Sequence, residues 1–87
     1  VTVYFVKTGS SNSPISYKQP SVVAKFGNGT GPGIVIGAHM DTTMSSSFKK
    51  KPGADDDGSG SVTLMETART LLASGMKFNK PIYFVWY

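Results

Sequence analysis

The chain of 87 residues contains no cysteine. It therefore has neither a disulfide framework nor a thiolate metal site, and any metal must be held by histidine, aspartate or glutamate. Histidine is scarce as well, because His39 is the single one. The candidate metal ligands are thus reduced to a few positions before any motif is considered.

Acidic residues are also few, with five against nine basic ones. One lies at Asp41, and Asp55, Asp56 and Asp57 form an acidic triplet within KPGADDDGSGS. Like charges in such proximity raise one another's pKa and destabilise the folded chain unless a cation or a dipole compensates. We therefore expect a positive charge near this triplet.

Long hydrophobic runs are missing, since GIVIGA and PIYFVWY are far shorter than a membrane span and no cationic-apolar signal segment opens the chain. We expect a soluble chain, or a processed or excised piece of one. The net charge of +4 suggests nucleic-acid binding. However, the basic residues are scattered apart from Lys49 to Lys51, without interleaved aromatic residues, so this function ranks last.

The remaining pattern predicts an α/β fold with strands at 1–8, 21–26, 33–41 and 81–87, and a glycine-rich turn after the second strand that suits a hairpin. Segment 58–75 predicts an amphipathic helix that ends at Gly75. Its apolar face comprises Leu64, Met65, Ala68, Leu71 and Leu72. The order of strand, helix and strand predicts parallel pairing through a right-handed crossover.

One domain with a modest core is the simplest organisation for this length. The chain begins inside a strand at Val1 and stops at Tyr87 in an apparently central strand, with no following helix to cover its far face. We therefore expect residues 1–87 to be the incomplete N-terminal part of a larger α/β domain. A longer natural polypeptide would confirm this expectation.

His39 and Asp41 lie at the carboxyl end of the predicted strand 33–41, and ligands in α/β sheets lie beyond the carboxyl ends of parallel strands. Their spacing on extended backbone points both side chains to one side, so that Asp41 can reach one imidazole nitrogen while the other holds a metal. Alone, a histidine at a strand end more often bonds a loop. The acidic triplet, which the loop 42–54 delivers at the start of the helix, favours the metal site.

Aspartate is favoured at the N-cap and in the first turn of a helix, but one or two aspartates are enough for that purpose. The three acids here therefore suggest a further role. A calcium loop places its oxygens at alternate positions rather than consecutive ones, so it is disfavoured. One imidazole together with carboxylates at the end of a sheet favours a zinc-like centre.

GAHMD followed by PGADDDGSGS and an amphipathic helix resembles the bacterial leucyl aminopeptidases, secreted zinc enzymes of metallopeptidase family twenty-eight. The resemblance extends from QPSVVAKF to PIYFVWY. It implies the zinc-dependent exopeptidase (phosphorylase/hydrolase-like) fold, a three-layer α/β/α structure with a mixed sheet, of which about four strands and one main helix are present. It also implies peptide substrates with a free N-terminus.

The resemblance implies two co-catalytic zinc ions, with His39 as a ligand of one and Asp56 as the bridging ligand. Asp41 then orients the metal-bound His39, and Asp57 matches a position joined to the bridging acid by a cis peptide. Asp55 receives no metal role because relatives often have asparagine there. In relatives, two glutamates directly after the strand equivalent to PIYFVWY provide the general base and a further ligand. No general base is therefore expected in this chain, which we predict to be inactive alone.

The intact enzyme is expected to hydrolyse the N-terminal residue, leucine or another apolar residue, by metal-assisted attack of water, and to be secreted or periplasmic. Related zinc carboxypeptidases and deacylases typically have lysine after the acidic pair, whereas Gly58 follows it here. Glutaminyl-cyclase-like and other exopeptidase members of the fold remain alternatives. A different alternative is a non-catalytic module that forms a homo-oligomer or a swapped dimer through exposed strand edges.

Overall fold

The structure is a computed structural model that describes residues 1–7, 19–43 and 50–87. Thr8 of the first predicted strand, Lys49 of the lysine run and part of the predicted loop 42–54 lie outside the described residues. The strands are β1 (Thr2–Val6), β2 (Ser21–Phe26), β3 (Ile34–Ala38) and β4 (Ile82–Trp86). A π-helical turn, η1 (Ala54–Gly58), leads into the long helix α1 (Ser59–Ser74). The predicted α/β fold is confirmed.

The four strands form one mixed sheet in the order β1-β2-β4-β3. β3 and β4 are parallel and are connected through α1, as the pattern of strand, helix and strand predicts. The predicted hairpin after β2 is wrong, because β4 lies between β2 and β3 and pairs antiparallel with β2. β2 instead forms its other antiparallel pair with β1.

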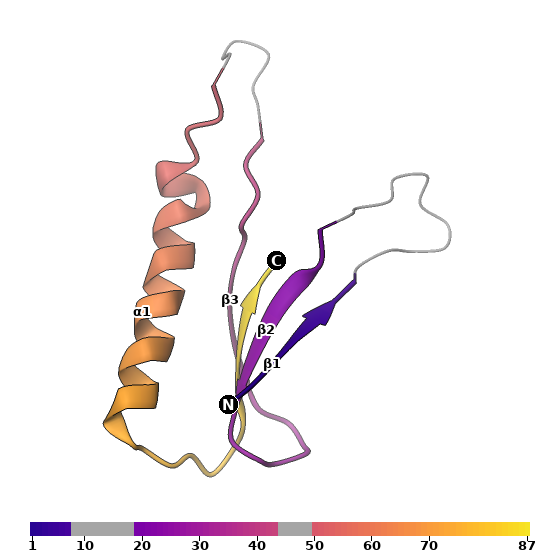
Figure 1. Ribbon diagram of the computed structural model, residues 1–87, viewed down its shortest axis with the longest axis vertical. Coiled ribbons are helices and arrows are strands. Elements are labelled where there is room, and N and C mark those ends of the chain that lie inside the picture. Colours follow the sequence, from indigo (N-terminus) through magenta and orange to yellow (C-terminus); the bar gives the residue numbers. More distant parts are fainter. Residues whose placement is uncertain (8–18, 44–49) are drawn as a thin grey trace.

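Helix α1 covers one face of the sheet on the side of β3 and β4, while β1 diverges from it (Figure 1). The core between helix and sheet centres on Phe84 of β4, which is fully buried. Its ring packs at a tilt against Phe26, with centroids 5.1 Å apart, and stacks on Trp86 at 6.4 Å. Leu64 of α1 is buried in the same cluster. Through Leu64, the first half of α1 packs against this cluster of the sheet.

The apolar face predicted for α1 is only partly buried. Leu64 is buried, and Ala68 and Leu71 pack against the core cluster. Met65 and Leu72 are exposed instead, at 60% and 61%. The sheet contacts of α1 are chiefly with β3 and β4. The C-terminal stop is as predicted, since Gly75 adopts the left-handed conformation with φ 67°.

Within residues 1–7, 19–43 and 50–87, no helix has the length and apolar character needed to cross a membrane.

Candidate metal site

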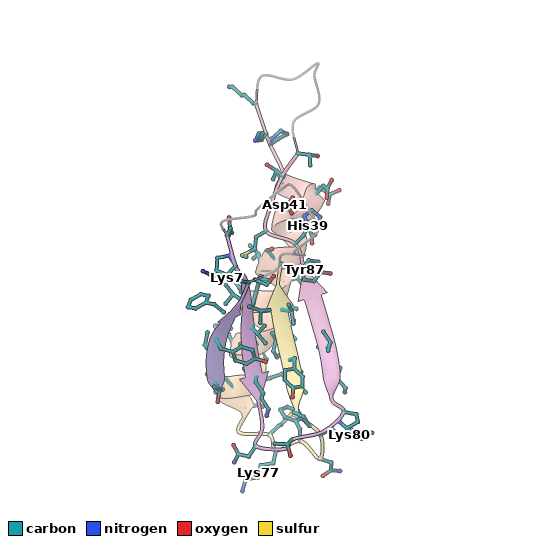
Figure 2. The ribbon with its side chains drawn as sticks, turned by 90° about the vertical axis from the view of Figure 1, so that its right-hand side faces the viewer. Lys7, His39, Asp41, Lys77, Lys80 and Tyr87 are labelled. Atoms are coloured by element: carbon teal, nitrogen blue, oxygen red, sulfur yellow. The ribbon has the colours of Figure 1, made fainter. Side chains whose placement is uncertain are left out.

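The candidate site lies at the carboxyl end of β3. Figure 2 shows His39 and Asp41 beyond the end of this strand, near Tyr87 at the end of β4, whereas Lys77 and Lys80 lie at the opposite end of the sheet. β3 ends at Ala38, so the two site residues are on the segment that leaves the strand. This is the edge at which ligands of α/β sheets bind.

The Nδ1 atom of the His39 ring faces two oxygen acceptors of one residue. It lies 3.1 Å from the carbonyl oxygen of Asp41 and 3.2 Å from the carboxylate Oδ1 of the same residue. Because neither oxygen can donate a proton, Nδ1 must carry the hydrogen. The lone pair of the neutral ring is then on Nε2, which is the atom available to a metal.

The Nε2 atom of His39 lies 2.9 Å from Oδ1 of Asp56. The Asp56 side chain is 87% exposed and that of His39 is 37% exposed. The next residue, Asp57, is joined to Asp56 by a cis peptide bond. Its Oδ2 accepts a hydrogen bond of 3.1 Å from the backbone N–H of His39. The structure thus brings His39, Asp41, Asp56 and Asp57 together.

The pKa of His39 is raised above its ordinary value of 6.5. The largest cause is the hydrogen bond to the backbone carbonyl of Asp41, which partial desolvation of the ring opposes. The charge of Asp57 and the hydrogen bond and charge of Asp56 raise it further. In this arrangement a proton on Nε2 takes the place that a metal cation would occupy beside Asp56.

Two glycines permit the path of the acidic triplet. Gly53 has φ 54°, a left-handed conformation that most residues avoid, and a Cβ there would overlap Cγ2 of Thr42. Its carbonyl accepts a hydrogen bond of 2.8 Å from the N–H of Gly58, which closes the turn η1. At Gly60 a Cβ would overlap the carboxylate of Asp57. The two glycines therefore leave the space that the acidic triplet occupies next to Thr42 and the first turn of α1.

Asp55 points into different surroundings from its two neighbours. Its carbonyl oxygen accepts a hydrogen bond from the Ser59 hydroxyl at 3.2 Å. Among the described residues, the hydrogen bonds and ion pairs of the His39 ring go to Asp41 and Asp56. It lines a hollow on the surface next to the site, together with Asp56 and the residues Thr42, Thr43, Pro52, Gly53 and Ala54. This hollow offers room beside Asp56, one of the two candidate ligands.

The described ranges contain no group of three or more histidine, cysteine, aspartate or glutamate side chains able to enclose a metal ion. His39 and Asp56 therefore supply two donors, one nitrogen and one oxygen, and a catalytic zinc usually has three protein ligands. The donor types suit a divalent ion of the zinc class, and the two atoms lie together, 2.9 Å apart. The pair fits part of a metal site and does not complete one.

The sequence did not predict the part played by Ser61 and Trp86, whose side chains donate hydrogen bonds to backbone carbonyls at or next to the site. The hydroxyl of Ser61 donates to the carbonyl of His39, and the Trp86 indole donates to the carbonyl of Ser61. Neither bond leaves a local signal, because its partners are more than twenty positions apart. Gly60, three residues after Asp57 and inside the predicted helix, was a usable signal of close approach.

Residues 21–87 match the profile of Peptidase family M28. The leucine aminopeptidase 1 of Metarhizium robertsii is 46% identical over 88 residues, which cover 93% of this chain and 22% of the relative. The crystal structure of the LapA aminopeptidase of Legionella pneumophila matches with a TM-score of 0.80 and 50% identity. LapB from the same organism matches with a TM-score of 0.76 and 45% identity. Each Legionella match covers 99% of this chain and 21% of the other.

The chain belongs to Peptidase family M28, as the profile match over residues 21–87 shows. Members of this family are generally metal-dependent, which agrees with candidate ligands at the carboxyl edge of the sheet. The predicted resemblance to this family is confirmed. The chain spans about a fifth of the length of the relatives that it matches.

Proposed function

We propose that the protein acts, within a larger catalytic domain, as a zinc aminopeptidase that removes an N-terminal leucine or another apolar residue from peptides. The single observation that carries this proposal is the approach of His39 Nε2 to Asp56 Oδ1 at the carboxyl edge of the sheet. The similarity to a leucine aminopeptidase from Metarhizium robertsii and to an aminopeptidase from Legionella pneumophila supports the reaction class.

In this proposal His39 and Asp56 would hold zinc, of which the intact enzyme would bind two ions. A bound zinc ion supplies Lewis-acid polarisation of the peptide carbonyl and lowers the pKa of water. Asp41 keeps the proton of His39 on Nδ1, which leaves Nε2 free as a ligand. Asp57 anchors the backbone of His39 through the bond to its N–H. The general base and the remaining ligands would come from outside residues 1–87.

We further propose that residues 1–87 form the N-terminal part of the catalytic domain and are inactive alone. The share of about a fifth of the relatives' length supports this, as does the two-donor site. We also propose that the protein is secreted or periplasmic, on the strength of the resemblance alone.

The test is hydrolysis of leucine p-nitroanilide by the longest natural polypeptide that contains residues 1–87. The proposal expects activity that a chelator removes and added zinc restores, and that His39→Ala abolishes. The 87-residue chain, assayed at the same concentration with zinc, is expected to be inactive. Activity that persists after complete removal of metal would contradict the proposal.

Exposed strand edges favour self-association as a second candidate function. β1 and β3 are the edge strands of the sheet, and their apolar side chains are largely exposed, including Phe5 at 69% and Val35 at 68%. Unpaired apolar edges invite pairing with another chain. Size-exclusion chromatography of the 87-residue chain at several concentrations tests this, and a monomer at every concentration would contradict it.

A further inference from the structure

The backbone of His39 is held on both sides by bonds that do not involve its ring. Its N–H donates to Oδ2 of Asp57 at 3.1 Å, and its carbonyl accepts from the hydroxyl of Ser61 at 3.0 Å. Ser61 is in the first turn of α1, so both bonds tie the end of β3 to the start of the helix. The peptide groups of His39 are thereby fixed relative to the acidic triplet.

The bond from Ser61 continues into the core through Trp86. The indole Nε1–H of Trp86 donates to the carbonyl of Ser61 at 3.2 Å. The Trp86 ring stacks on Phe84, whose side chain is fully buried. A continuous path of contacts thus runs from the core of the sheet through Trp86 and Ser61 to His39.

We propose that Ser61 and Trp86 are positioning residues for the metal-binding nitrogen of His39. The inference rests on the proposed metal role of this histidine. An imidazole ring has two rotatable bonds, so the direction of Nε2 is defined only when the backbone is fixed and the ring is held at a second point. Ser61 and Trp86 fix the backbone, and Asp41 holds the ring at Nδ1.

The hydrogen bond of the Ser61 hydroxyl differs from those that serine and threonine hydroxyls usually make inside a helix. The hydroxyls of Thr63, Thr67 and Ser74 donate to carbonyls three or four residues earlier in the same helix. Ser59 likewise donates to the adjoining turn η1. Among the described side chains of α1, the Ser61 hydroxyl alone reaches across to another part of the fold, 22 positions away in sequence. Its bond is therefore tertiary and directed at the candidate ligand.

The experiment uses the longest natural polypeptide that contains residues 1–87 and measures binding of cobalt(II) together with the visible absorption of the bound ion. Ser61→Ala removes the hydroxyl, and Trp86→Phe removes the indole N–H while keeping a ring against Phe84. Thr67→Ala is the matched control, because it removes a hydroxyl bond of the same helix that does not contact His39. Ser61→Thr restores a hydroxyl at the tested position. Circular dichroism verifies that each variant is folded.

Ser61→Ala is expected to weaken cobalt binding about tenfold and to change the visible spectrum, since outer partners of metal ligands typically contribute about 10–100-fold to affinity. Trp86→Phe is expected to weaken cobalt binding and to change the visible spectrum in the same direction as Ser61→Ala, but to a smaller extent. Ser61→Thr and Thr67→Ala are expected to retain the wild-type spectrum. If Ser61→Ala and Trp86→Phe match Thr67→Ala in affinity and spectrum, the positioning role is overturned while the proposed function stands. A wild-type protein that binds no cobalt overturns the proposed function, and the positioning role with it.

Discussion

The carboxylate of Asp57 lies directly against Gly60, where a Cβ atom would come within 2.6 Å of the Asp57 carboxyl carbon. The same carboxylate accepts the backbone N–H of His39. The absence of a side chain at Gly60 therefore leaves the space in which Asp57 anchors the candidate ligand.

Gly60→Ala is expected to destabilise the protein by about 1–3 kcal/mol, the usual cost of forcing extra volume into an occupied site. Helix propensity alone predicts the opposite sign, because alanine is better than glycine in a helix by about 1 kcal/mol. Gly31→Ala is the matched control, since a Cβ there meets nothing within 4 Å. Urea unfolding measures both variants, and a Gly60→Ala protein as stable as the wild type would contradict the prediction.

His39 is expected to titrate above pH 6.5 in the metal-free protein, and Asp56→Asn is expected to lower its pKa by removing a negative charge beside Nε2. Because the folded pKa is raised, the stability contributed by His39 is fully present below the unfolded pKa. It is lost as the pH rises through the folded pKa. The single histidine makes its NMR signals unambiguous. A pKa at or below that of the urea-unfolded chain would refute the prediction.

Asp56→Asn is expected to weaken zinc binding by at least about 100-fold, because losing a ligand costs more than losing an outer partner, for which about 10–100-fold is typical. Asp55→Asn removes the same charge one residue earlier without a contact to His39, and it is expected to bind zinc nearly as well as the wild type. Competition with a chromogenic chelator measures both. Equal losses in the two variants would indicate a diffuse charge effect instead of coordination by Asp56.

Phe84→Ala is expected to destabilise the protein by about 3–5 kcal/mol, the usual cost of deleting a buried aromatic ring. Phe84 is fully buried and contacts the rings of both Phe26 and Trp86. Met65→Ala in the 87-residue chain is the control, because Met65 of α1 is 60% exposed, and exposed substitutions usually change stability by no more than about 0.5 kcal/mol. Thermal unfolding followed by circular dichroism compares the two, and similar losses would refute this description of the core.

The parts of the fold that depend on local pattern were predictable from the sequence. The apolar strands, the amphipathic helix and its end at Gly75 each have a short-range signal, and so does the parallel pairing of β3 with β4. The position of β4 next to β2 was not predictable in this way, because strand order depends on which edge the crossover returns to. The exposure of Met65 and Leu72 depends on what lies over α1, which helical periodicity does not encode.

The candidate site, too, was predictable from the sequence only in part. The spacing of His39 and Asp41 and the acidic triplet point to a common site, and the structure brings Asp56 and Asp57 to His39. The metal roles of these residues stay predictions. Ser61 and Trp86 were missed because they act through backbone carbonyls, and any residue supplies a carbonyl.

The central claim is that His39 Nε2 is a metal ligand, and nitrogen-15 NMR of this histidine during a zinc titration tests it most directly. The account predicts that the Nε2 resonance shifts as zinc binds, while Nδ1 keeps its proton and its bond to Asp41. No change at Nε2 in saturating zinc, or coordination through Nδ1, would contradict the account.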